Sequence, residues 1–492
     1  MIPRDYQSRD LVGIRAMFAS GATRVLHVLP TGGGKTVEFC EMVKLASARG
    51  NRCVILVHRD NLLRQASAKL REAGVKHGII APGHGNHGDT VHVASIMTLV
   101  RRMDKYEFDF IIPDEAHHAV TPTHRKIFDR YPKARILGVT ATPCLASGRG
   151  LDSVFQKMHL GPNIAWLIRE GYLAEPDTYG PKKKLDLSRI KIAMGDYAQA
   201  QLAEAMDTPR ITGDAVSHYS EICPGVPTIC FAVNIKHAED SAAAFAAAGY
   251  RAAVVHGKLP LETIRARIGG LADGSVQVLA ACDLISEGTD IPSVVCAISL
   301  RPTKSLGLHI QQAGRALRPM YAPGHDLSTR AGRLAAIAAG PKPKAILLDH
   351  AANCFRHLTV DEEHVWSLEG RKKKTKNGPA TKTLTQCPKC LRPFDARASK
   401  CPHIESDGTP CGWVRTTTPR DPETEIGTLE KVDKVALRRA KWGEERACKT
   451  IEDLIAIGVA RRYQWPKQWA EKRWGFMRPK KDKPATDEEM FA

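Results

Sequence analysis

The residues best suited to chemistry begin with the stretch LPTGGGKT at positions 29–36, which follows the apolar run VLHV. Its three consecutive glycines allow a tight turn in which successive backbone N–H groups face one phosphate. A helix beginning after Lys35 would add the positive end of its dipole. Lys35 can reach the β- and γ-phosphates, and the Thr36 hydroxyl can ligate Mg²⁺. The stretch predicts an ATP site made by Thr31, Gly32, Gly33, Gly34, Lys35 and Thr36.

This loop departs from the general pattern GxxxxGK(S/T), because Leu29 stands where that pattern has its first glycine. That position mainly ends the preceding strand, so a leucine there changes little physically. Taken alone, the stretch could also be a glycine-rich turn with an incidental lysine.

A second stretch, FIIPDEAHH at 110–118, places two carboxylates directly after an apolar run. Asp114 can hold Mg²⁺, and Glu115 can orient or deprotonate an attacking water. An acidic pair at a strand end can also lie in a solvated loop or cap a helix. Its combination with the phosphate-binding stretch favours nucleotide hydrolysis.

Short apolar runs that alternate with helical patterns must position these residues. Such a rhythm predicts parallel strands in doubly wound α/β domains, which bind ligands at the carboxyl ends of their strands. The first set of expected strands is 24–30, 52–58, 90–96, 108–115 and 134–143. The second set is 227–233, 251–257, 276–282, 294–300 and 344–350. Two α/β domains are therefore expected.

Seven motifs in order give the chain a resemblance to the superfamily-two helicases and translocases over residues 3–350. They are RDYQ (4–7), PTGGGKT (30–36), LVHRDNLLRQ (56–65), DEAH (114–117), TAT (140–142), ISEGTDIP (285–292) and QQAGRALR (311–318). The family's own form of the phosphate loop does not require glycine at the Leu29 position. The resemblance implies two tandem RecA-like domains with ATP between them.

The resemblance also implies roles for residues outside the phosphate loop. Gln7 would read the adenine base, and Gly288 and Asp290 would complete the nucleotide site. The implied nucleic-acid contacts are His58, Arg59 and Thr98. The implied coupling residues, which link hydrolysis to strand movement, are His117, Thr140 and Thr142.

Gln311, Arg315 and Arg318 are the catalytic residues implied for the second domain. Two arginines one helical turn apart can share a face and point at a γ-phosphate across a cleft. The resemblance makes them arginine fingers, whereas the alternative is an ordinary basic helix face.

Three further stretches are similar to the RadD group of bacterial DNA-repair helicases. They are WLIREGYLAEPDTY (166–179), SLRPTKSLGLHIQQAGRALRP (299–319) and AILLDHAAN (345–353). The chain departs from that group at Ala116, where the group has cysteine, and in a shorter cysteine-rich segment. The sequence DEAHH is also common in restriction-type and bacteriophage helicases.

Four cysteines between 387 and 411 have the spacing C-x2-C-x10-C-x9-C. Thiolates two residues apart can bind one tetrahedral ion, so Cys387, Cys390, Cys401 and Cys411 predict a closed structural zinc site. His403 could replace one cysteine. Residues 364–420 carry twelve Lys or Arg and four Asp or Glu, a local net charge of +8. This charge suits contact with a phosphate backbone, although a module that merely anchors the C-terminal helices is also consistent with it.

The composition agrees with a soluble protein that binds a polyanion. A chain of 492 residues is too long for a single hydrophobic core, and its net charge of +19 suits a polyanionic partner. No apolar run is long enough to span a membrane. The polar N-terminus does not resemble a secretory signal, so a cytoplasmic location is expected. The protein is also expected to be a monomer. The tryptophans near the C-terminus could stack on single strands or pack within helices.

The expected fold is α/β, with a small zinc-ribbon-like module and a helical C-terminal region after the two RecA-like domains. The expected boundaries are 1–150 for the first domain, 151–225 for a mostly helical connector, 226–368 for the second domain, 369–384 for a basic linker, 385–415 for the zinc module, 416–478 for the helical region and 479–492 for a disordered tail.

The expected function is an ATP-dependent DNA helicase or translocase in repair, recombination or replication, using ATP, Mg²⁺ and structural Zn²⁺. DNA is favoured over RNA as partner, and recombination or replication proteins are further candidate partners. The alternatives are an RNA-remodelling helicase, a restriction-type or phage translocase without strand separation, and a zinc-stabilised recruitment factor with a weak ATPase.

Overall fold

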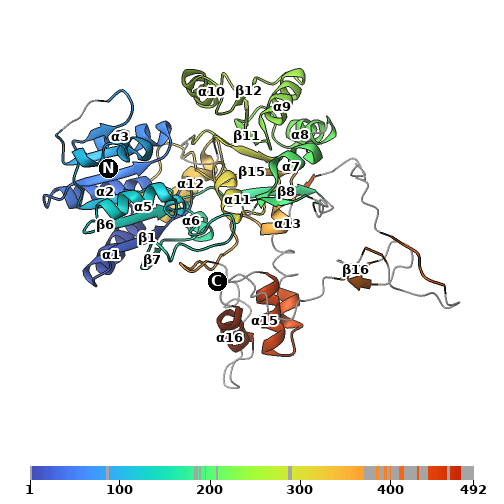
Figure 1. Cartoon of the computed structure of the whole chain (residues 1–492). Coiled ribbons are helices and arrows are strands. Elements are labelled where there is room, and N and C mark those ends of the chain that lie inside the picture. Colours follow the sequence, from blue (N-terminus) through green and yellow to red (C-terminus); the bar gives the residue numbers. More distant parts are fainter. Residues whose placement is uncertain are drawn as a thin grey trace. The chain divides into compact units, whose positions relative to one another are not determined.

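The computed structural model separates the chain into two compact units, residues 1–371 with 426–492 and residues 372–425. The described residues are 3–84, 88–181, 187, 190–193, 196–206, 209–285, 291–370, 384–386, 393–395, 399–400, 409–414, 429–431, 442–461 and 466–477. The larger unit contains two parallel-sheet domains (Figure 1).

The first domain is built on a seven-stranded sheet in the order β3-β4-β2-β5-β6-β1-β7. All of its strand pairs are parallel. The strands are β1 (Arg24–Val28), β2 (Cys53–Val57), β3 (Gly78–Ile80), β4 (Val91–Ser95), β5 (Phe110–Pro113), β6 (Arg135–Thr140) and β7 (Lys157–Leu160). The five strands predicted for this domain are confirmed.

Each face of this sheet has its own hydrophobic core, because successive strand residues point to opposite faces. In β2, Ile55 packs in a core with residues of α1 (Asp5–Ala19), α2 (Lys35–Ser47) and α3 (Asp60–Glu72). Its neighbour Leu56 packs in the opposite core, with residues of α4 (Ile96–Leu99) and α5 (Pro122–Arg130). Burial on both faces explains why these strands are continuous apolar runs.

The second domain has a seven-stranded sheet in the order β12-β13-β11-β14-β15-β8-β18. Its strands are parallel except for β18, which is antiparallel to β8. They are β8 (Pro176–Pro181), β11 (Thr228–Phe231), β12 (Ala252–Val255), β13 (Val278–Ala281), β14 (Cys296–Ser299), β15 (Ala345–Asp349) and β18 (Leu429–Lys431). The five strands predicted here are also confirmed.

Six helices accompany this second sheet. Residues of α8 and α9 pack in one core with strand residues, and residues of α10 and α11 pack in the other. The helices are α8 (Pro209–Ile222), α9 (Ile235–Ala247), α10 (Leu261–Asp273), α11 (Leu306–Ala313), α12 (Arg330–Ala339) and α13 (Asn353–His357).

The segment between the domains differs from the expected helical connector. It contains three helices, α6 (Ile164–Arg169), α7 (Gln199–Met206) and α8, but β7 completes the first sheet and β8 joins the second. Both strands have weak sequence signals, since β7 (KMHL) lacks a buried apolar run and β8 (PDTYGP) contains two prolines and a glycine. Residues 429–431, expected to be helical, form β18 instead.

Near the C-terminus, α15 (Ile451–Ala460) packs on α16 (Pro466–Met477). A methyl group at Gly458 would lie 3.0 Å from Cε3 of Trp469, which supports the packing role considered for this tryptophan. In the smaller unit, β16 (Leu384–Gln386) and β17 (Pro393–Asp395) pair antiparallel. Among the described residues, no helix is both long and apolar enough to cross a bilayer. The predicted tail, 479–492, lies outside the described residues.

Candidate nucleotide-binding site

The phosphate-binding stretch forms a tight turn between β1 and α2. Gly33 N–H donates to the Pro30 carbonyl at 3.0 Å, and Gly34 adopts a left-handed conformation (φ +86°) immediately before Lys35 starts the helix. Leu29 is fully buried, and a methyl group at Gly33 would lie 2.8 Å from its Cγ atom. The buried leucine side chain therefore packs directly against the turn.

Side chains of helix α1 form hydrogen bonds to carbonyl groups of the same loop. The Tyr6 hydroxyl donates a 2.6 Å hydrogen bond to the Gly33 carbonyl. Gln7 Nε2 lies 3.2 Å from the Gly34 carbonyl, and Gln7 Oε1 accepts from the Arg4 amide at 2.9 Å. Gln7 is buried. Its amide thus joins the beginning of α1 to the loop.

The carboxylates of the second motif lie at the carboxyl end of β5, facing the loop lysine. Lys35 Nζ is 3.7 Å from Glu115 Oε1, and the Glu115 amide donates to Asp114 Oδ1 at 2.9 Å. Burial and the neighbouring Glu115 raise the pKa of Asp114 to about 6, although Lys35 opposes the shift. Glu115 has a positive φ of 50°, an uncommon conformation for a non-glycine residue.

A hydrogen-bonded chain joins the second motif to the end of β6. His117 Nδ1 lies 3.2 Å from Thr140 Oγ1, and this hydroxyl also interacts with the Thr142 carbonyl at 3.0 Å. The Thr142 amide is 3.2 Å from the same oxygen. The three residues predicted to couple hydrolysis to movement are therefore in contact.

Residues following α11 bring the second domain against the phosphate loop. A methyl group at Gly314 would lie 3.0 Å from Thr31 Cβ, and one at Gly32 would lie 3.5 Å from Arg318 Cγ. Arg315 is 4% exposed. Because α11 ends at Ala313, both arginines follow the helix, so their predicted placement on a regular helix face is wrong. Turns made by backbone bonds of residues 314–317 position them instead.

Two further contacts connect the domains. Arg59 donates to the carbonyls of Asp283 and Leu284 at 3.2 and 2.9 Å. Arg265 donates to Asp60 at 2.6 Å. The predicted nucleic-acid residue Arg59 thus also makes an interdomain contact.

Of the other predicted site residues, His58 lies beside the second motif, with its ring centroid 5.1 Å from that of His118. His58 is exposed and Thr98 is 9% exposed. Gln311 is buried, and its Nε2 atom has no hydrogen-bond partner among the residues that the structure describes. Cys411 is buried. The other predicted residues, Gly288, Asp290, Cys387, Cys390, Cys401 and the alternative ligand His403, lie outside the described part of the chain.

Sequence reasoning missed one support of the loop, the Tyr6 hydroxyl. Tyr6 is next to Gln7, but no spacing rule distinguishes a tyrosine that bonds a distant carbonyl from one in a core. Gly314 belongs to the predicted arginine motif, although its spacing did not indicate that it would lie against Thr31.

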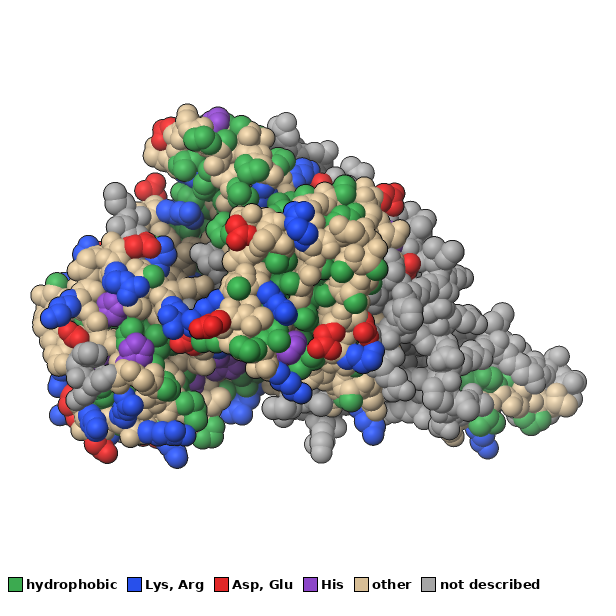
Figure 2. Space-filling model, turned by 90° about the horizontal axis from the view of Figure 1, so that it is seen from above, with side chains coloured by type: hydrophobic (Ala, Val, Ile, Leu, Met, Phe, Trp, Pro, Cys, Tyr) green, Lys and Arg blue, Asp and Glu red, His purple; other side chains and the backbone are tan. Residues whose placement is uncertain are grey.

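The surface charge of the described residues is distributed. Figure 2 shows Lys and Arg side chains over much of the visible face, with Asp and Glu side chains among them.

Comparison with known proteins adds two family matches. Residues 1–145 match the family described as type III restriction enzyme, res subunit, and residues 215–320 match the helicase conserved C-terminal domain. A 51.5 kDa protein of a Lactococcus phage (isolate 7-9) is 31% identical over 380 residues, which cover 76% of this chain and 75% of the phage protein.

A second relative is the candidate ATP-dependent helicase IRC3 of Saccharomyces cerevisiae, which is 31% identical over 352 residues. The match covers 65% of this chain and 50% of IRC3, so this chain spans half of the yeast protein. A fragment of a candidate HsdR subunit of a type I restriction enzyme from Vibrio vulnificus has a similar fold, with a TM-score of 0.56 at 19% identity. That similarity covers 73% of this chain and 66% of the fragment.

Proposed function

Since this chain belongs to the superfamily-two helicases, we propose that it is an ATP-dependent DNA helicase or translocase acting in repair, recombination or replication. One observation carries the proposal: Thr31 and Gly32 of the phosphate loop lie against Gly314 and Arg318 of the second domain. A nucleotide on this loop would therefore be in reach of both domains, and its hydrolysis would alter their contact.

In the proposed nucleotide site, Lys35 leaves Glu115 and pairs with the β- and γ-phosphates, while the loop amides bind phosphate oxygens. Glu115 then orients the attacking water. Thr36 and the buried Asp114 offer the oxygen donors that Mg²⁺ prefers, so these residues fit that ion. When bound, Mg²⁺ would offset negative charge on the phosphates.

Gln7 is proposed to sense the base through its contact with the loop, and Gly288 and Asp290 remain proposed nucleotide contacts. Arg315 and Arg318 are proposed to bind the γ-phosphate from the second domain. Because this contact exists only before hydrolysis, ATP favours the closed arrangement and its hydrolysis releases it. The chain His117–Thr140–Thr142 would transmit the change, since a methyl group at Gly307 of α11 would lie 2.9 Å from Thr142 Oγ1.

DNA is proposed as the partner because the protein carries a net charge of +19 and resembles a restriction-enzyme subunit in fold. His58, Arg59 and Thr98 are the proposed strand contacts. Within the superfamily, the stretches at 166–179 and 299–319 favour kinship with the RadD group. The second candidate is an RNA-remodelling helicase, since backbone-binding motifs do not distinguish the two sugars.

The test is ATP hydrolysis by the full chain with no polymer, single-stranded DNA, duplex DNA, forked DNA and RNA. We expect stimulation by DNA. Stimulation by RNA alone would support the second candidate, and absence of turnover under every condition would reject the enzyme. Lys35→Ala should abolish hydrolysis, whereas Lys44→Ala, on the exposed side of the same helix, should not.

The cysteine segment is proposed to bind a structural zinc ion through Cys387, Cys390, Cys401 and Cys411. Two antiparallel pairings support this: β16 and β17 flank the first two cysteines, and the bridge between Lys400 and Val414 flanks the other two. A closed four-cysteine set is typical of structural zinc. Elemental analysis should find one zinc ion fewer per chain in the Cys387→Ser/Cys390→Ser variant, and an unchanged content would reject the site.

A further inference from the structure

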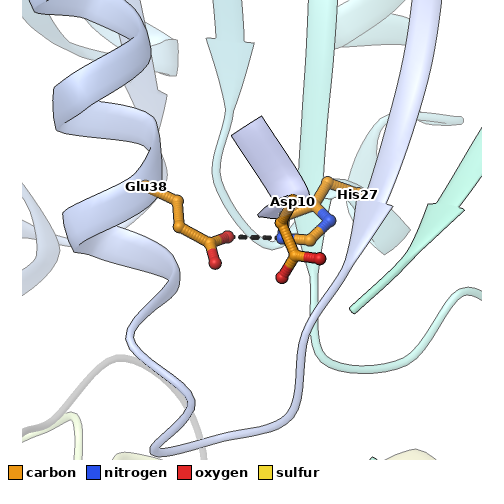
Figure 3. A group of neighbouring side chains, drawn as sticks. All are labelled: Asp10, His27 and Glu38. Atoms are coloured by element: carbon orange, nitrogen blue, oxygen red, sulfur yellow. Dashed lines mark hydrogen bonds and ion pairs between the residues drawn. The ribbon is translucent and has the colours of Figure 1, made fainter. Parts of the chain in front are cut away.

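Two carboxylates and one imidazole form a buried cluster on the elements that flank the phosphate loop (Figure 3). It contains Asp10 of α1, His27 of β1 and Glu38 of α2, which are 6%, 0% and 1% exposed. Each residue offers one potential ligand atom, and these three atoms lie within 4.8 Å of one another. The cluster therefore combines three metal-binding side chains from three separate elements.

Two buried carboxylates share this cluster with an imidazole. His27 Nε2 is 2.5 Å from Glu38 Oε2, and His159 Nε2 of β7 is 3.0 Å from Asp10 Oδ1. The His27 ring also interacts with the backbone of His159, and the Asp10 and Glu38 side chains are close enough to share one proton. When both carboxyls are ionised, Asp10 Oδ2 and Glu38 Oε1 have no hydrogen-bond donor among the described residues, so the pair needs a shared proton or a cation.

The chain that follows β7 packs closely against the cluster. A methyl group at Gly161, just after β7, would lie 2.9 Å from Asp10 Oδ2 and 3.3 Å from His27 Cε1. A side chain at this position would crowd both groups, so the glycine allows the backbone to approach them.

The donor set suits a divalent cation, because carboxylate and neutral imidazole are the forms of these side chains that bind metal ions.

We propose that Asp10, His27 and Glu38 bind a structural zinc ion on the elements that flank the phosphate loop, with His159 orienting Asp10 through its hydrogen bond. An imidazole among carboxylates suits zinc better than magnesium. Ligand bonds of about 2.0–2.1 Å would separate His27 Nε2 and Glu38 Oε2 to about 3.3 Å. The second oxygen of Glu38 is the candidate fourth donor.

The site would be structural because its ligands are buried and leave no open position for a substrate. It would join three elements that hold the phosphate loop: α1, which carries Tyr6 and Gln7, β1, which leads into the loop, and α2, which begins at Lys35. This role is independent of the polymer that stimulates hydrolysis and of the cysteine site.

The first test measures metal binding in the full-length Cys387→Ser/Cys390→Ser chain, which removes the other proposed zinc site. After equilibration with zinc and removal of loose ions, we expect one zinc ion per chain by elemental analysis. Cobalt should give the weak visible bands of a nitrogen–oxygen site without intense thiolate-to-cobalt bands in the near ultraviolet. Absence of bound zinc and of these visible bands would overturn the proposal, whatever the ATPase activity.

The second test adds Glu38→Gln to the same background, with His124→Gln as a matched control. His124 is a buried histidine of the same domain that bonds Thr121 at 2.8 Å. Glu38→Gln should reduce zinc from one ion per chain to none, while His124→Gln should retain it. Retention of zinc in a folded Glu38→Gln variant would overturn the assignment. If the Glu38→Gln variant does not fold, the cobalt spectrum of the Cys387→Ser/Cys390→Ser chain tests the proposed site by itself.

Discussion

Replacement of Lys342 by methionine should stabilise the protein at pH 7 and destabilise it at pH 10. This lysine is fully buried between α12 and β15, where its Nζ donates to the Val294 carbonyl and lies 3.5 Å from the Pro292 carbonyl. Burial, assisted by the charge of Arg318, lowers its pKa from 10.5 to about 7. The folded protein therefore binds fewer protons than the unfolded chain between these pH values, and its stability rises with pH across that window.

The magnitudes predict a change of sign. Burial of Lys342 lowers the free energy of unfolding by about 4 kcal/mol at pH 7 and by about 1 kcal/mol at pH 10. The difference arises because each pH unit between the folded and unfolded pKa values changes this free energy by about 1.4 kcal/mol. Methionine removes this loss of stability but leaves the Val294 carbonyl unpaired, which costs about 2 kcal/mol. The net effect is a gain of about 2 kcal/mol at pH 7 and a loss of about 1 kcal/mol at pH 10.

Calorimetry of the two proteins at both pH values measures this difference. In a domain of about 150–250 residues, each kcal/mol of stability changes Tm by about 2–4 °C. The Lys342→Met variant should therefore have a Tm about 4–8 °C higher at pH 7 and about 2–4 °C lower at pH 10. The matched control is Lys344→Met, because Lys344 is 46% exposed and pairs with Asp177 at 3.2 Å. Its effect should stay below about 1 kcal/mol without a change of sign. A Lys342→Met shift of the same sign at both pH values would refute the reasoning.

Three further substitutions test the phosphate loop and its connections. Tyr6→Phe removes the buried hydrogen bond to Gly33, worth about 1 kcal/mol, so nucleotide titration should show about fivefold weaker ATP binding. Gly314→Ala places a methyl group 2.8 Å from the Ile310 carbonyl oxygen and 3.0 Å from Thr31 Cβ, so these neighbours must shift slightly and kcat should fall about fivefold in steady-state ATPase assays. Thr140→Val breaks the hydrogen-bonded chain to the second motif, so unstimulated hydrolysis should persist while its stimulation by nucleic acid falls toward none.

Controls distinguish these effects from general destabilisation. Gly257→Ala adds a methyl group that would meet no described atom within 4 Å, so its kcat should match that of the unaltered protein. Equal kcat values for Gly314→Ala and Gly257→Ala would contradict the close contact between domains. Unchanged ATP affinity in Tyr6→Phe would show that its hydroxyl does not order the loop, and full stimulation in Thr140→Val would exclude this residue from coupling.

The strands and the phosphate loop could be predicted because their signals are local. Central strands such as β2 are buried on both faces, which requires continuous apolar residues, and the glycines before Lys35 encode the turn themselves. The strands β7 and β8 escaped prediction because pairing partners from distant parts of the chain compensate for their weak propensity.

The contacts around the loop depend on long-range packing and could not be read from spacing. Asp10 and His159 are 149 positions apart, yet their side chains form a hydrogen bond. Arg318 was expected to approach the nucleotide from a helix, but the chain leaves α11 before reaching it. The role of Arg318 remains a proposal based on the resemblance, whereas its local backbone follows from the end of α11 at Ala313.

The position of β8 determines where the protein can be divided for separate expression. This strand precedes the rest of the second domain in sequence but pairs with β15 through residues 176–179. A fragment starting at residue 226 would leave the backbone groups of β15 on that side unpaired, and such exposed edges promote aggregation. A fragment that begins before Pro176 would retain the pairing, so the division that preserves both sheets lies between β7 and β8.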